Sequence, residues 1–283
     1  MSAPVQQPAP DAAQHQAAQG GLAVVLASSL AALWASLDVT RLATALPAFK
    51  AGVAAVVIRH AQASAALAAQ QYQRQRVAAG VGGSFRPSAA PPPKVAQIAQ
   101  SVDWAVQPLW NYNVQTAAHE NQQRLREALA ATGTPTADYL DALLQIEPAQ
   151  EAPSAGSAIA DAKARLAASS ERLVLDTGRN TVIDSAQRDP KAKGWARIPE
   201  PGACSFCLML ATRGAVYRSE STADFKSHDN CRCHVEPVFT AYEPSAAVRQ
   251  AQALWASSTR GKSGNAARIA FRQAVEGRTA PTK

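Results

Sequence analysis

CSFC at residues 204–207 and HDNCRCH at residues 228–234 contain all four cysteines of this 283-residue chain. Cysteines scattered at random would almost never gather in so short a segment. A Cys-x-x-Cys pair in a tight turn places two thiolates on one side of a metal ion, roughly 2.3 Å from it. The second stretch supplies further donors. The spacing therefore predicts a zinc knuckle that staples a C-terminal module too small to hold itself together.

A tetrahedral metal shell takes four ligands, and the two stretches offer five good candidates. The candidates are Cys204, Cys207, His228, Cys231 and Cys233. We expect Cys204, Cys207 and Cys231 in any metal site, and His228 ranks slightly ahead of Cys233 for the fourth place. His228 and Cys231 can supply two ligands from one turn, whereas Cys231 and Cys233 face the same way if they lie on a strand. The sequence leaves this choice open.

Two interpretations without metal remain: the four cysteines are buried reduced thiols, or they form two disulfides. The sequence shows no export signal, so we expect a reducing cytoplasm, where clustered cysteines more often bind metal than form disulfides. A closed shell of four protein ligands is structural, because a catalytic zinc keeps an open position.

Catalytic motifs do not match the sequence. Zinc deaminases carry His-x-Glu before Pro-Cys-x-x-Cys, but here His234-Val235-Glu236 follows the Cys-x-x-Cys pair. His234 also faces the other side of the expected strand from Cys233, which makes it the least expected ligand. No Gly-x-Ser-x-Gly, His-Glu-x-x-His or Walker sequence occurs. We therefore expect no enzyme activity.

Changes in composition, together with glycines and prolines that interrupt helices, divide the chain into four segments. They are a disordered arm (1–20), a helical region (21–157) with a linker at about 80–93, a long helix plus knuckle module (158–244), and a basic helical tail (245–283). We predict a mainly α fold: an N-terminal helical bundle with a small C-terminal α+β zinc-knuckle module.

Apolar periodicity, proline and glycine place the individual elements. The expected helices cover residues 21–79, 94–131, 137–146, 158–189 and 245–272. Pro47 and Pro108 should bend the first two, and Gly261–Gly264 should interrupt the last. The expected strands cover residues 215–218 and 234–239.

Two apolar runs, residues 21–37 and 42–58, approach the length of a membrane span. We interpret both as buried helices and expect no membrane contact, since the first contains several serines and the second is broken by Pro47 and Lys50. No Lys or Arg precedes the first run, so it lacks the basic start of a signal peptide.

The formal net charge is +7, and basic residues concentrate in the tail. From residue 245 onward these are Arg249, Arg260, Lys262, Arg268, Arg272, Arg278 and Lys283, against the single acid Glu276. Such a tail is either a solvated face or a surface that meets a polyanion or an acidic protein.

Large aromatic residues are expected as core or interface anchors rather than as platforms for nucleobases. They are Trp34, Trp104, Trp110, Trp195 and Trp255. His60 and His119 are expected to be ordinary helix residues.

Several motifs follow one another in order through the C-terminal third. They are RNTV (179–182), GWAR (194–197), PGACSFC (201–207), RGAVYRS (213–219) and HDNCRC (228–233). In these motifs the chain resembles the Mu F-like minor head proteins of tailed bacteriophages, closest to forms from phages and prophages of actinobacteria. That family's pattern is a Cys-x-x-Cys, a Gly-x-x-Tyr segment and a terminal His-x-x-Cys-Arg-Cys or Cys-Arg-His. LWASL (33–37) and PLW (108–110) also resemble it.

The resemblance implies a non-enzymatic protein of the inner phage head that assists head assembly and DNA packaging or delivery. Its implied partners are the portal protein and capsid or scaffold proteins, with non-specific double-stranded DNA reached through the basic tail. The family's Cys and His positions fall on the five candidate ligands. The alternative is a zinc-knuckle nucleic-acid-binding protein without a head role, and a metal-dependent enzyme or toxin ranks behind both.

Overall fold

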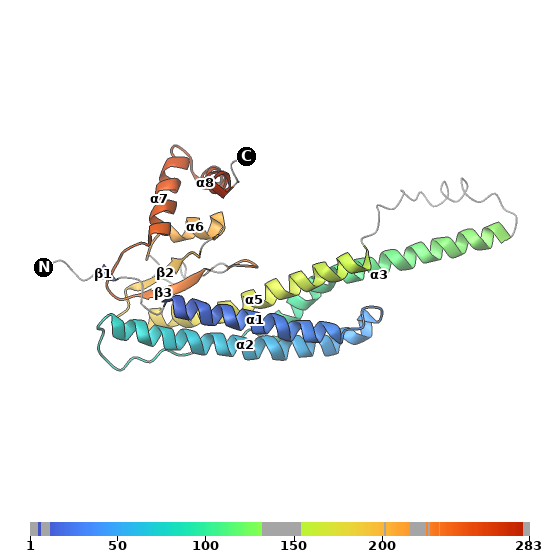
Figure 1. Ribbon diagram of the computed structural model, residues 1–283, viewed down its shortest axis with the longest axis horizontal. Coiled ribbons are helices and arrows are strands. Elements are labelled where there is room, and N and C mark those ends of the chain that lie inside the picture. The colour runs from blue at the N-terminus through green and yellow to red at the C-terminus, as the bar shows by residue number, and fades with distance from the viewer. Residues whose placement is uncertain are drawn as a thin grey trace. The chain divides into compact units, whose positions relative to one another are not determined.

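The computed structural model describes residues 5–6, 12–131, 154–200, 202–215, 225, 227–231 and 233–279. These residues are mainly helical, with small sheets contributed largely by the C-terminal third (Figure 1), so the expected mainly α fold class is confirmed. The helix expected at 137–146 and most of the strand expected at 215–218 lie outside them.

The long helices are α1 (Ala12–Ala35), α2 (Leu42–Ala78), α3 (Val95–Ala131) and α5 (Ala155–Arg188). Pro47 and Pro108 lie inside α2 and α3, which continue through them. Residues 79–94 form no helix or strand, as the density of glycine and proline predicts.

The expected single helix over 21–79 is wrong, because α1 and α2 are separated at residues 36–41. The cause is Asp38, whose Oδ1 accepts hydrogen bonds from the backbone N–H groups of Thr40 (3.0 Å) and Arg41 (3.2 Å). An aspartate that binds backbone donors two and three residues ahead ends one helix and starts the next.

The expected disordered arm over residues 1–20 also needs correction. Helix α1 begins at Ala12, and Val5–Gln6 forms a short parallel pairing, β1, with β4 (Ala241–Tyr242). The alanines and glutamines of residues 12–20 have good helix propensity, so an unpatterned composition did not mean disorder here. Residues 1–4 and 7–11 lie outside the described part.

By length and composition, α1 from Ala13 and α2 could both cross a membrane. Only 17% of the apolar window of α1 is buried, against 39% for α2. The expectation that α1 is a buried helix is therefore wrong for most of its surface: Leu26, Leu30 and Trp34 are buried, but Val24 is 67% exposed. An uncharged alanine-rich helix can pack against its neighbours through only a narrow apolar stripe along one side.

The C-terminal third contains a two-stranded antiparallel sheet and short helices. Strand β2 (Gly194–Ile198) pairs with β3 (His234–Val238), with Trp195 opposite Pro237. Helix α6 (Ser205–Ala211) packs with α7 (Ala246–Ser258) and α8 (Gly264–Thr279) around Phe271. The helical tail interrupted near Gly261–Gly264 is thus confirmed. We call the described residues from 194 to 239 the cysteine module.

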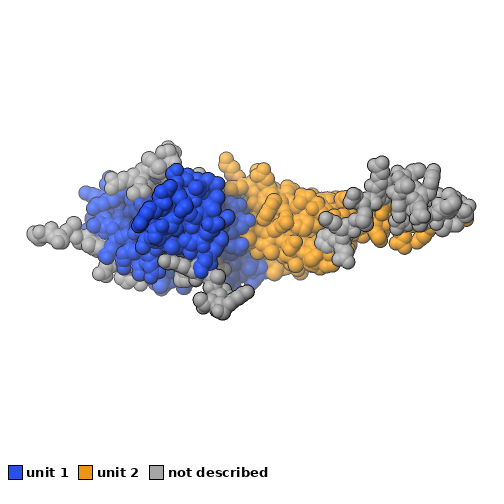
Figure 2. Space-filling view, turned by 90° about the horizontal axis from the view of Figure 1, so that it is seen from above, with its two compact units in different colours: residues 1–28, 56–93, 171–283 blue, residues 29–55, 94–170 orange. Residues whose placement is uncertain are grey.

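The chain forms two compact units, coloured in Figure 2. Unit 1 contains residues 1–28, 56–93 and 171–283, and unit 2 contains residues 29–55 and 94–170. Their boundaries fall within α1, α2 and α5 and at residues 93–94, between α2 and α3. In unit 1, the cysteine module shares one apolar core with the second half of α2, where Tyr72 is fully buried.

Candidate metal centre

Four thiols and one imidazole gather in the cysteine module. Within the described residues, two groups of three donors have all their ligand atoms within 4.8 Å of one another: Cys204, Cys207 and His228, and Cys207, Cys231 and Cys233. Cys207 belongs to both groups. The five side chains that the sequence singles out therefore lie close together, and all four cysteines are free thiols rather than disulfides.

The first pair is delivered by a glycine turn and a helix start. Gly202 has φ +78°, a conformation that glycine adopts without strain, and it lies just before the turn that leads into α6. Cys204 is the N-cap of α6, and its Sγ accepts a hydrogen bond from the backbone N–H of Cys207 at 3.4 Å. The expected tight Cys-x-x-Cys turn is thus the first turn of a helix.

The second stretch is also a turn. The backbone N–H of Cys231 donates to the carbonyl of His228 at 3.0 Å, and Asn230 between them takes φ 64°. Asparagine is one of the few side chains that enter this left-handed region readily. Cys231 and Cys233 both precede β3, which begins at His234, so the alternative that places the two cysteines on a strand does not hold.

The donors are close enough for a thiolate–imidazole metal site, but among the described residues they form two overlapping groups of three rather than one shell of four. The Sγ atoms of Cys207 and Cys231 lie 3.5 Å apart, and His228 Nε2 lies 2.9 Å from Cys204 Sγ. Metal–sulfur bonds of about 2.3 Å at tetrahedral angles place neighbouring sulfurs roughly 3.8 Å apart. Soft thiolate donors with imidazole suit zinc or a similar transition metal.

His228 is oriented as a ligand would be. Its Nδ1 lies 2.7 Å from the carbonyl oxygen of Asp229, which can only accept, so Nδ1 carries a proton. Nε2 faces the sulfurs of Cys204 and Cys207, so a metal ion bound there would take the place of any proton on Nε2. A ring N–H donated to a carbonyl is the usual way in which proteins fix the tautomer of a metal-binding histidine.

The thiols polarise one another. Hydrogen bonds with Cys207, and then with His228, lower the pKa of Cys204 to about 5. Hydrogen bonds to its three neighbouring cysteines raise the pKa of Cys207, and those from Cys207 and Cys233, with the charge of Arg179, lower the pKa of Cys231. The pKa of Cys233 is raised, so the cluster favours the thiolate at Cys204 and Cys231 and the thiol at Cys207 and Cys233; the thiolate is the form that binds metal.

Two buried arginines lie behind the thiols. Arg197 Nη1 is 3.5 Å from Cys207 Sγ, and Arg179 donates to the backbone carbonyls of Cys231 and Cys233. Both guanidinium groups contact the ring of Phe225, at 3.5 Å and 4.9 Å from its centroid. Both arginines stood in the motifs quoted above, but sequence reasoning gave them no role, because spacing alone does not show which backbone groups a side chain reaches.

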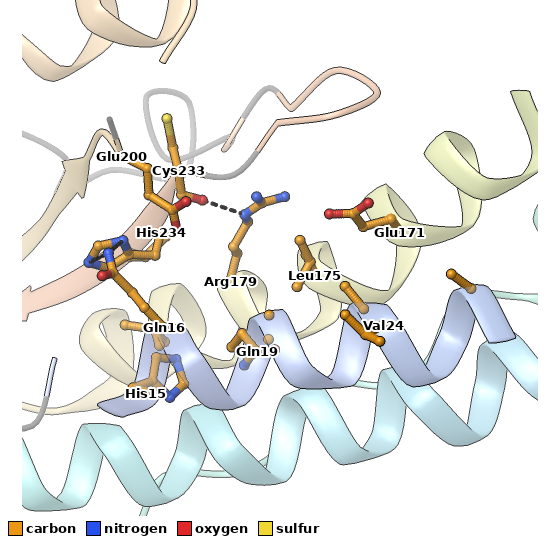
Figure 3. A pocket seen from close by; sticks show the side chains of 16 residues that line it. His15, Gln16, Gln19, Val24, Glu171, Leu175, Arg179, Glu200, Cys233 and His234 are labelled. Atoms are coloured by element: carbon orange, nitrogen blue, oxygen red, sulfur yellow. Dashed lines mark hydrogen bonds between the residues drawn. The ribbon is translucent and has the colours of Figure 1, made fainter. Parts of the chain in front are cut away.

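A pocket of about 460 Å³ borders the cysteine module (Figure 3). Its walls come from α1, α5 and β3, with apolar residues such as Val24 and Leu175 beside Gln16, Glu171 and Glu200. His234 points into it, with Nδ1 2.9 Å from Gln16 Nε2, and belongs to neither group of three metal donors. Sequence reasoning missed this pocket, since α1 is distant in sequence.

The expectations for the other histidines and for the tryptophans agree with the structure only in part. His60 is buried and its Nδ1 lies 2.8 Å from the carbonyl of Val56, whereas His119 is exposed, so both are helix residues outside the site. Trp34 and Trp195 are buried. Trp104 is 49% exposed, so of the expected core and interface roles the structure contradicts the core role for this residue.

Comparison with known protein families found a match over most of the chain. The family model described as VG15 protein matches residues 6–258, most of the chain. Searches of curated proteins and of solved structures found no match.

Proposed function

The chain belongs to the VG15 protein family, a viral gene protein family that points to a phage protein, and from that premise we propose that it is a minor head protein of a tailed phage. In this proposal it associates with the portal protein and with capsid or scaffold proteins. It works inside the head after assembly in the host cytoplasm, and assists head assembly and DNA packaging or delivery. It has no catalytic role.

The thiol–imidazole cluster is the observation that carries this proposal. It joins CSFC to HDNCRC, the two motifs on which the resemblance to Mu F-like minor head proteins depends, through contacts such as Cys207 Sγ to Cys231 Sγ at 3.5 Å. Proteins that act as docking parts need a rigid surface more than a reactive centre. A stapled module in a helical chain provides such a surface.

A zinc ion would be held by Cys204, Cys207 and Cys231, with His228 or Cys233 as the fourth ligand. When bound, it would cross-link the two stretches and supply no reaction, because four protein ligands close its shell. The chain's own residues already hold the donors: α6 presents Cys204 and Cys207, and the turn at Asn230 returns Cys231 to them.

Metal content of the purified protein tests the site. We expect stoichiometric zinc in the wild type, loss of zinc in Cys204→Ser, and reduced zinc in His228→Ala. His119→Ala, which changes an exposed histidine outside the cluster, should keep the full content. Wild-type protein without bound metal after expression in zinc-containing medium overturns the site.

Co-sedimentation tests the head role. Phage heads purified by density gradient should contain the protein, and the protein should co-sediment with isolated portal rings. A protein found free in lysates and never with heads or portal overturns the proposal. Tight DNA binding that falls steeply with salt and needs no portal would instead favour the nucleic-acid-binding alternative.

A further inference from the structure

Three side chains of α5 contact the metal-binding turn from one face of that helix. They are Arg172, Asp176 and Arg179, spaced four and three residues apart, and residues at such spacing lie on the same side of a helix. The contacts they make cover the turn from its beginning to its end, although the turn is about fifty residues away in sequence.

Arg179 makes the most extensive of these contacts and is 5% exposed. Its Nε donates to the Cys233 carbonyl at 2.9 Å, as Figure 3 shows, and another nitrogen donates to the Cys231 carbonyl. Its third nitrogen donates to Asp176 Oδ1 at 2.7 Å. One planar guanidinium thus fixes the backbone on which two of the thiols are carried.

Asp176 and Arg172 hold the beginning of the same turn. Asp176 Oδ2 accepts a hydrogen bond from Ser227 Oγ, directly before His228. Arg172 Nε lies 2.7 Å from Asp229 Oδ1, directly after it. The imidazole of His228 is therefore bracketed by two contacts to α5.

We propose that Arg179, supported by Asp176 and Arg172, is a positioning residue that shapes the backbone at residues 227–231 and 233 for the metal before the metal binds. This inference rests on the metal site of the proposed function. None of the three side chains is a ligand. They act through the backbone and the flanking side chains of the ligands, and outer contacts of this kind typically change metal affinity about 10- to 100-fold.

The planar fork of Arg179 is what a lysine cannot replace. Lysine keeps the positive charge near Cys231 but is a point donor that cannot bind two carbonyls and a carboxylate in one plane. Arg179→Lys therefore separates geometry from charge. We expect a Co²⁺ or Zn²⁺ affinity about 10- to 100-fold below that of the wild type, with a shifted d–d absorption spectrum of the Co²⁺ form.

Arg188→Gln is the matched control on the same helix. Arg188 is exposed, and its Nε donates to the carbonyl of Asp184 within α5. We expect wild-type affinity and spectrum from it. Asp176→Asn keeps the carbonyl contacts of Arg179 and weakens its anchor, so its affinity should fall less than that of Arg179→Lys. It also keeps the test open if Arg179→Lys does not fold.

The measurement is a chelator competition with Zn²⁺ and with Co²⁺ on full-length protein whose helix content matches the wild type by circular dichroism. Wild-type affinity and an unchanged Co²⁺ spectrum in both Arg179→Lys and Asp176→Asn would overturn the positioning role while leaving the metal site intact. Wild-type protein that binds neither metal overturns the site and this inference together.

Discussion

Unit 2 and the cysteine module bury different kinds of side chain. In unit 2 the described buried residues are apolar, such as Val102, Val106 and Leu166, apart from Ser169 and Ser170. The cysteine module buries Arg197 and Glu236 beside three of its thiols, and Arg179 of α5 reaches into it. Apolar burial stabilises a helical unit without help, whereas a buried polar cluster does so only when every member has its partner.

This difference indicates which part of the chain a bound metal would stabilise. Each thiolate taken from water costs free energy unless a cation or donor compensates for it. The two arginines supply part of that compensation, and an ion shared by four ligands would supply the rest. Unit 2 should therefore be indifferent to metal, and the cysteine module should not be.

Cys207→Ser should have the largest effect, because Cys207 belongs to both donor groups. Structural zinc contributes an apparent binding free energy of about 10–16 kcal/mol in small zinc-finger peptides, so its loss should unfold β2, α6 and β3. Hydrogen–deuterium exchange should show these segments exchanging fast while helix α3 keeps its wild-type protection.

The control for this change is Ser205→Ala, which alters a residue between the two cysteines of the CSFC stretch and should leave exchange unchanged. Chelation of the wild type should reproduce the Cys207→Ser pattern. Equal exchange of β2 and β3 in the variant and the wild type would contradict the difference between the two regions. The cysteine module would then be as independent of metal as unit 2.

The sequence predicts local features of this site well and distant ones poorly. Cysteine spacing gathers the ligands because each pair lies within one turn of the chain, and Gly202 and Asn230 are residues that such turns favour. Arg179 and the pocket residue Gln16 reach the module only through the fold. Nothing in the order of residues indicates which carbonyl or ring they will meet.

Helix boundaries follow the same rule. The breakers between residues 79 and 94 correctly separate α2 from α3. The division between α1 and α2 depends on one side chain, Asp38, whose hydrogen bonds are not visible in apolar periodicity. The prediction for Trp104 fails for another reason: a large apolar residue on a helix is not placed in the core by its residue type alone.

Asp189→Asn tests a second buried charge in unit 1 and should rank next. Asp189 and Arg76 are almost fully buried and lie 2.8 Å apart, and Tyr72 also donates to Asp189. Leaving Arg76 without its carboxylate should cost about 3–5 kcal/mol of unfolding free energy in urea titration. Asp103→Asn is the control, since Asp103 pairs with Lys50 in unit 2 but is 53% exposed, and should cost less than about 1 kcal/mol.

The same pair predicts a pH dependence. Burial raises the pKa of Asp189, but hydrogen bonds from Arg76 and from the Lys191 backbone N–H outweigh it and hold the pKa below its usual value of 3.8. The stabilisation is therefore present above that value and is lost as the pH falls through the lower pKa of the folded state. Asp189→Asn should remove this part of the acid sensitivity; an equal acid response in both proteins would contradict it.

Gly178→Ala should have a moderate effect, since Gly178 lies where α5 approaches α2 in unit 1. A Cβ there would lie 2.5 Å from Ser64 Oγ and 3.2 Å from the Ser64 carbonyl oxygen. Overpacking of this kind costs about 1–3 kcal/mol. Gly277→Ala is the control, because its Cβ would meet nothing within 4 Å and alanine should gain about 0.5–1 kcal/mol in a helix. Stabilisation by Gly178→Ala as well as by Gly277→Ala in urea titration would contradict this expectation, because it would show that Ser64 moves away from the added Cβ at little cost.

Trp104→Ala should have the smallest effect and sharpens the contrast from the side of unit 2. The ring of Trp104 is 49% exposed, and the guanidinium carbon of Arg165 lies 5.2 Å from its centroid. Losing an exposed cation–π contact costs about 0.5–1 kcal/mol. Trp34→Ala, in the same unit, removes a ring that is 7% exposed and 5.0 Å from that of Phe49, and should cost about 3–5 kcal/mol. Neither change should alter the metal content, because unit 2 is stabilised by apolar burial. A loss of zinc in Trp34→Ala would contradict this, because it would show that metal binding by the cysteine module depends on the stability of unit 2.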